Sequence, residues 1–260
     1  MTERYEFAQQ LAEAAVEIAG IDSNPAISAE RLASELGVAK HELDIEEDGR
    51  LRLDGQQPVA LLRRDRPLAR KRFTLCHEVA HWLLLSGVAG EEVTRLACAA
   101  SESEEYLCDK VAGAMLMPGS WVQRSYRGWP RTLATVDAIA RAAEVSRSAA
   151  LVRLRDELGW RHSLVQWQNR RGRWVLQGQA GLYPAQHGMV HTTEATRFEL
   201  SRAAALRRDP NDPLTLQIGS HEVPVVAELR ATGSRATALV ELPYPSGGAR
   251  RAVRQYSGAT

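Results

Sequence analysis

RKRFTLCHEVAHWLLL, residues 70–85, is the stretch that decides the fold of the first half of this chain. Apolar residues on both sides of the His-Glu-x-x-His run predict a mostly buried helix. Residues four apart on a helix differ by about 40° in azimuth, so His77 and His81 leave one face and can bind one metal ion. Glu78 stands beside the first histidine, where a carboxylate can take a proton from an attacking water. The spacing therefore predicts a metal-dependent hydrolytic site.

Such a short run can also arise by chance, in a helix whose two histidines do not bind a common metal ion. The apolar flanks argue against this alternative, because neutral histidines in a buried helix need polar partners. A metal ion would be such a partner. A third residue able to bind the same ion would therefore favour a metal site over a chance occurrence.

A second segment, residues 102–117, predicts another helix and offers the third ligand. Glu105 and Asp109 are four apart and share a face. This suits Glu105 as a metal ligand and Asp109 as the hydrogen-bond partner of a ligand histidine. Glu102 and Glu104 are the alternative ligands, and Glu102 lies three residues before Glu105. Glu104 points about 100° away from Glu105, and an acidic first turn is also favoured by the helix dipole.

Two stretches together resemble the ImmA/IrrE group of metallopeptidases: RFTLCHEVAH at residues 72–81 and EYLCDKVAGAMLMP at residues 105–118. The family patterns are RFTLAHExxH and ExxANxFAAxLLMP. Cys108 in place of alanine is similar to the radiation-response IrrE branch, whereas Asp109 for asparagine and Val111 for phenylalanine depart from the pattern.

By this resemblance, His77, His81 and Glu105 are the metal ligands, Glu78 is the general base and Asp109 orients a ligand histidine. The cofactor is expected to be Zn²⁺, although two imidazoles and one carboxylate also admit Mn²⁺. The family characteristically cuts a helix-turn-helix repressor of the XRE type and so derepresses DNA-damage or mobile-element genes. The resemblance predicts a metallo-endopeptidase with a protein substrate.

The fold class expected is α+β, beginning with a zincin-like metallopeptidase domain at residues 1–130. Helices are predicted at residues 5–19 and 28–36. Short alternating runs separated by Asp48-Gly49 and Asp54-Gly55 predict a small antiparallel sheet before the histidine helix. An edge strand of this sheet could hold an extended peptide by backbone pairing.

Residues 131–160 predict a helix-turn-helix module, in which Ser146 caps the second helix. Arg147, Arg153 and Arg155 would lie on a recognition helix if the module bound DNA. The preferred interpretation is a helical module that packs on the peptidase or holds a protein substrate, because a single monomeric helix makes few base contacts.

Residues 161–260 predict a small α+β domain, with strands at 163–168, 173–177, 214–218, 222–229 and 235–242 and a helix at 193–206. The family resemblance implies a GAF-like sensor domain here, and a small-molecule ligand follows by analogy alone. The histidines of this half show no metal-ligand spacing; they are His162, His187, His191 and His221.

The net charge of the 260 residues is +1, so the overall charge predicts no strongly acidic or basic binding partner. Residues 1–130 carry 15 basic and 21 acidic side chains, against 18 and 11 in residues 131–260. The three cysteines predict no disulfide framework, and Cys76 and Cys108 are expected to be core residues rather than ligands or redox switches. With no signal segment and no apolar run long enough for a membrane span, a cytoplasmic protein is expected.

These features favour a metal-dependent endopeptidase, and the family resemblance implies that its substrate is a helix-turn-helix repressor. One alternative is a DNA-binding transcription regulator with a structural or vestigial metal site, and another is a ligand sensor dominated by its C-terminal domain. The intact His77, Glu78, His81 and Glu105 set speaks against a vestigial site.

Overall fold

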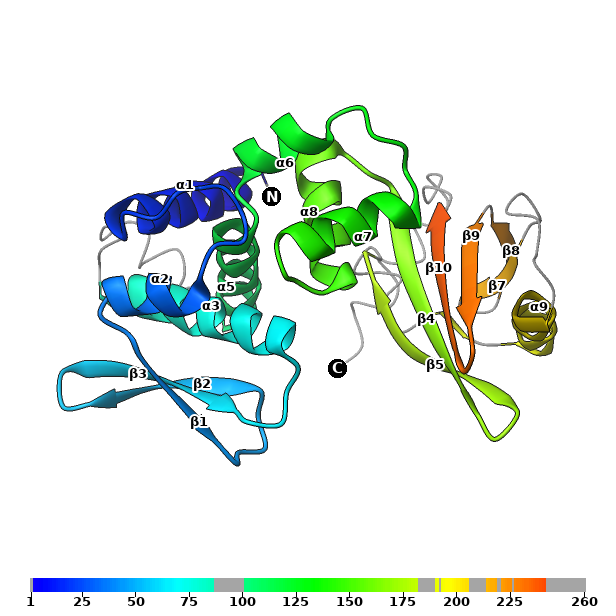
Figure 1. The fold of residues 1–260 in the computed structure, drawn as a ribbon, viewed down its shortest axis with the longest axis horizontal. Coiled ribbons are helices and arrows are strands. Elements are labelled where there is room, and N and C mark those ends of the chain that lie inside the picture. The colour runs from blue at the N-terminus through cyan, green and yellow to red at the C-terminus, as the bar shows by residue number, and fades with distance from the viewer. Residues whose placement is uncertain are drawn as a thin grey trace, which may run out of the picture. The chain divides into compact units, whose positions relative to one another are not determined.

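The computed structural model describes residues 2–86, 101–181, 190–191, 193–205, 214–218, 221–225 and 227–241. The chain divides into two compact units (Figure 1). The first comprises Met1–Trp129 and Asp137–Arg153, and the second comprises Pro130–Val136 and Leu154–Thr260. The fold class is α+β, as predicted. The three domain boundaries expected from the sequence remain a prediction.

In the first unit, the histidine helix lies at the centre. Its elements are α1 (Thr2–Ile18), α2 (Ala29–Glu35), β1 (Ala39–Leu43), β2 (Gly49–Asp54), β3 (Gln57–Arg63), α3 (Leu68–Leu85), α5 (Ser101–Leu116) and α6 (Gly119–Tyr126). The helix α3 packs against β2 and β3 of the sheet and against α2 and α5, and α1 packs on α5. This central position explains why α3 is apolar on nearly every side: Leu75, Cys76, Val79 and Ala80 are all fully buried.

The small sheet of this unit is mixed, which corrects the antiparallel sheet expected from the sequence. Its strand order is β1-β3-β2. The two-residue turn Gly55-Gln56 returns the chain as an antiparallel hairpin, with Asp54 opposite Gln57. The strand β3 lies between β1 and β2 and pairs in parallel with β1, with Val59 opposite Ala39. The apolar β3 thus becomes the buried central strand and leaves β2 as an edge strand next to α3.

The two helices expected between residues 132 and 158 are present as α7 (Leu133–Ala142) and α8 (Arg147–Leu158). The hydroxyl of Ser146 accepts a hydrogen bond from the Ala149 amide at 3.1 Å, the predicted N-cap. Both helices contribute residues to each of the two units. The DNA-binding interpretation of this module stays a prediction, and Arg153 bears on it directly.

Arg153 is a buried structural residue, which argues against the DNA-reading role it would have under the alternative interpretation. Only 2% of it is exposed. Its guanidinium donates twice to the Met117 carbonyl, at 2.9 and 3.1 Å, and also to Tyr5 Oη and Gln9 Oε1, each at 3.2 Å. The side chain therefore fastens α8 to α1 and to the end of α5.

Within its described residues, the second unit contains two sheets and one helix besides its parts of α7 and α8. A sheet of order β5-β4-β10-β9 is built from β4 (His162–Arg170), β5 (Arg173–Ala180), β9 (Ala227–Thr232) and β10 (Arg235–Glu241). The other sheet has the order β6-β7-β8, from β6 (Val190–His191), β7 (Leu214–Ile218) and β8 (His221–Val225). Helix α9 (Glu194–Ala205) contributes Leu200 to a core that includes Trp167, Trp174 and Leu216.

The single strand expected at residues 222–229 is two strands in different sheets. Pro224 lies in β8, opposite Thr215 of β7. Proline lacks a backbone donor and is confined to sheet edges, and β8 is an edge strand. The similarity of this unit to a GAF domain remains a prediction. No helix within the described ranges has the length and apolar character needed to cross a membrane.

Candidate metal centre

His77 and His81 leave the same face of α3 and point at each other through their Nε2 atoms, which lie 3.1 Å apart. The ring centroids are 4.8 Å apart and the planes are inclined by 68°. One turn of helix separates the two residues, so the local backbone alone sets this convergence.

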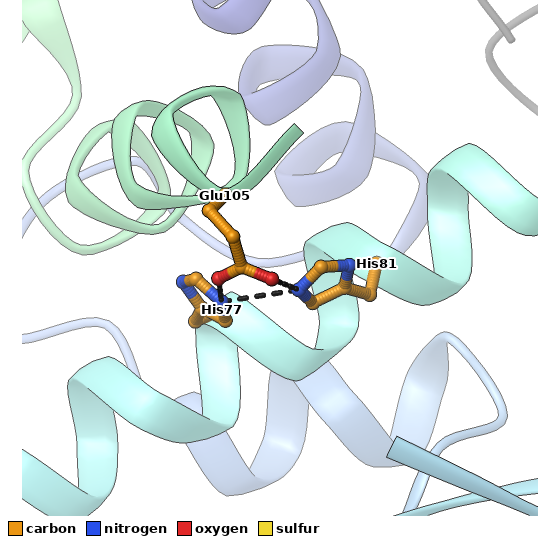
Figure 2. Close-up of side chains that lie close together, drawn as sticks. All are labelled: His77, His81 and Glu105. Carbon is orange, nitrogen blue, oxygen red and sulfur yellow. Dashed lines mark hydrogen bonds and ion pairs between the residues drawn. The ribbon is translucent and has the colours of Figure 1, made fainter. Parts of the chain in front are cut away.

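Glu105 of α5 completes a three-residue group (Figure 2). Its Oε2 lies 3.1 Å from His77 Nε2, and its Oε1 lies 3.3 Å from His81 Nε2. Tetrahedral zinc with bonds of about 2.0–2.1 Å separates its ligand atoms by roughly 3.3 Å. The spacing and the donor types of this group therefore fit a divalent cation such as zinc.

The outer nitrogen of each histidine also has a carboxylate partner. Asp109 Oδ1 lies 2.9 Å from His77 Nδ1. Burial disfavours the imidazolium form of His77, but the hydrogen bond and charge of Asp109, together with the charges of Glu78 and Glu105, outweigh burial and raise the pKa of His77. Glu104 Oε1 lies 3.0 Å from His81 Nδ1, a contact that sequence spacing did not predict. The alternative ligand Glu102 lies in the first turn of α5, where side chains fall outside the described part of the chain.

Glu78 follows His77 on α3 but lies against the edge strand β2. It is only 5% exposed, and this burial raises the pKa of its carboxyl group. A hydrogen bond from the Leu51 amide opposes the shift by favouring the carboxylate. Glu78, the general base expected from the sequence, is thus held by a backbone amide of β2, and its burial makes the carboxylate a stronger base.

Gly49 allows this approach of β2 to α3. A Cβ at this position would collide with Thr74 Cγ2 and would lie 3.2 Å from Glu78 Oε1. We therefore expect Gly49→Ala to destabilise the protein by about 1–3 kcal/mol through overpacking. Chemical denaturation would measure the change in the free energy of unfolding.

A second substitution makes the Gly49 prediction specific. Thr74→Ser removes the methyl group in question, so adding it to Gly49→Ala should recover part of the lost stability. Gly113→Ala is the matched control, because a Cβ there meets only Arg153 Cδ at an ordinary 3.5 Å. Equal stability of Gly49→Ala and wild type would contradict the close approach.

The two cysteines next to the site are buried free thiols. Burial raises the pKa of Cys76 to about 12 and raises that of Cys108 as well, so both remain protonated at neutral pH. Neither belongs to the group of converging ligand atoms. Their role as small core residues agrees with the expectation from the sequence.

The segment that contains this site matches a known protein family. Residues 29–155 match the family model of peptidase M78, described as the IrrE N-terminal-like domain. The chain carries an ImmA/IrrE-type domain. This domain contains both histidines and all the carboxylates discussed above. The match does not single out the radiation-response IrrE branch, which stays a prediction.

A solved structure named Mycobacterium tuberculosis transcriptional regulator is similar to the chain as a whole. The TM-score is 0.52 at 14% sequence identity, and the alignment covers 92% of this chain and 79% of the other. At this identity the similarity concerns the fold alone. None of the curated proteins compared with the chain matches it.

Proposed function

We propose that the protein is a metal-dependent endopeptidase in which His77, His81 and Glu105 hold the metal ion. The observation that carries this proposal is the convergence of two Nε2 atoms and one carboxylate, with all ligand atoms within 4.8 Å of one another. The ImmA/IrrE-type domain agrees with it. Zinc is the proposed metal, and manganese is the alternative that this donor set admits.

In the proposed mechanism, the bound ion would supply Lewis acidity, polarising a peptide carbonyl and lowering the pKa of the attacking water. Glu78 accepts the proton of that water and then delivers it to the leaving amine. Its buried setting suits the first step, because a raised pKa makes the Glu78 carboxylate a stronger base. The edge strand β2, which lies against Glu78, is proposed to pair with an extended substrate backbone.

The proposed substrate is a helix-turn-helix repressor of the XRE type, cut in the cytoplasm to derepress DNA-damage or mobile-element genes. This part rests on the ImmA/IrrE resemblance. The second unit is proposed to be a GAF-like sensor that controls the peptidase. Transcriptional regulation, the function for which the similar solved structure is named, is compatible with such a role.

A cleavage assay tests the proposal. The purified protein, with its metal content established by elemental analysis, is incubated with candidate repressors, and products are identified by mass spectrometry. We expect a single cut that a chelator abolishes and that the removed metal restores. Cleavage that persists in excess chelator would contradict the metal-dependent mechanism.

A second candidate function is a DNA-binding regulator whose metal site is structural, favoured by the similarity in fold to a protein named a transcriptional regulator. Gel shifts with random and promoter DNA discriminate the two candidates. The burial of Arg153 removes one arginine from the surface that this second function would need.

A further inference from the structure

We propose that Glu104 is a positioning residue for His81, the counterpart of Asp109 on His77. The inference rests on the proposed metal site and deepens it. Helix α5 would then provide one ligand, Glu105, and also the two carboxylates that fix the ligand histidines. The three side chains leave a single helix, so the position of α5 relative to α3 would set the whole centre.

The two nitrogens of each imidazole have separate partners. Both Nε2 atoms face each other and Glu105, whereas each Nδ1 atom faces its own carboxylate. An imidazole that binds a metal through Nε2 carries its proton on Nδ1 and donates it. A carboxylate on Nδ1 therefore selects the metal-binding tautomer, fixes the ring plane and makes Nε2 a stronger ligand.

The positions on α5 explain why one carboxylate is a glutamate and the other an aspartate. Asp109 lies one turn after Glu105 on the same face, where a short side chain reaches His77. Glu104 leaves α5 about 100° from Glu105, and its longer side chain places Oε1 3.0 Å from His81 Nδ1.

Water screens Glu104 least among these three carboxylates. Its side chain is 31% exposed, against 67% for Glu105 and 58% for Asp109. Because a hydrogen bond to a charged group is stronger where solvent is excluded, the contact with His81 should affect the orientation of its ring more than an exposed pair would. Its oxygen lies at Nδ1, away from the converging Nε2 atoms, which distinguishes it from a ligand.

Zinc affinity, measured by competition with a chromogenic chelator, tests the role without reference to peptidase activity. Glu104→Ala is expected to weaken zinc binding by about 10- to 100-fold. Glu104→Gln should restore most of the affinity, because its amide oxygen still accepts the Nδ1 proton. Glu35→Ala is the matched control: Glu35 is an exposed helical glutamate 3.9 Å from Arg31, and its loss should leave affinity unchanged.

A spectroscopic readout separates positioning from a general structural effect. In the zinc-bound protein, the Nδ1 proton of His81 should give a slowly exchanging NMR signal that Glu104→Ala abolishes or shifts, while the corresponding His77 signal stays. Melting temperatures of the metal-free variants should stay close to wild type, because a pair with a side chain that is 31% exposed contributes little to stability.

Three results would overturn the inference. Zinc affinity of Glu104→Ala within twofold of wild type would show that the contact with His81 has no role. X-ray absorption showing that this variant keeps both imidazole ligands but loses one oxygen ligand would make Glu104 a ligand instead. Failure of the wild-type protein to bind zinc would overturn the inference together with the proposed metal site, whereas the first two results leave that site intact.

Discussion

Glu78→Gln is expected to reduce peptide cleavage by about 10²- to 10⁴-fold while zinc binding stays at the wild-type level. Glutamine has the same shape, and its oxygen can still accept the hydrogen bond from the Leu51 amide. It cannot take a proton from water at neutral pH. Because Glu78 is not among the converging ligand atoms, its replacement leaves the coordination untouched. Cleavage rates and zinc affinity, measured on one preparation, check both parts.

The contrast with Glu105→Gln makes the assignment of Glu78 specific. Glu105 lies 3.1 Å from His77 Nε2, so its neutral variant should lose zinc affinity and activity together. If Glu78→Gln cleaved the substrate at more than a tenth of the wild-type rate, another residue would have to be the base. If it lost zinc as Glu105→Gln does, Glu78 would have to contribute to the coordination.

The candidate site could be predicted from the sequence wherever one helix determines the geometry. The separations His77 to His81 and Glu105 to Asp109 each span one turn, and helical geometry alone places both members of each pair on one face. That Glu104 meets His81 depends on how α5 packs across α3, which spacing within α5 does not contain. Sequence spacing predicts the direction in which Glu104 leaves α5 but not the residue that it contacts.

Non-local contacts account for the other differences. The pairing of β1 with β3 depends on the spatial order of three short strands in the sheet, which the sequence does not give. The hairpin signal at Asp54-Gly55 did locate the turn between β2 and β3 correctly. The contact between Glu78 and the Leu51 amide likewise joins a strand to a helix. Arginine is rarely buried, so the sequence does not predict the burial of Arg153, which the carbonyl that it binds at the end of α5 explains.

Arg153→Met is expected to lower the free energy of unfolding by about 2–4 kcal/mol. Methionine replaces most of the aliphatic stem but donates no hydrogen bond, so the Met117 carbonyl would be left without the two donors it has from Arg153. Tyr5 and Gln9 would lose a partner as well. Denaturant titration followed by circular dichroism would measure the loss.

Arg147→Met is the matched control for this variant, since it makes the same change on the same helix. Arg147 is 45% exposed and pairs with Asp137, so its replacement should cost less than about 1 kcal/mol. Equal stability of the two variants would contradict the anchoring role of Arg153. A DNA-reading arginine would give the opposite pattern, with DNA affinity lost and stability kept. The pair of variants therefore distinguishes two roles for α8: one in which Arg153 fastens it to α1 and α5, and one in which its arginines contact DNA.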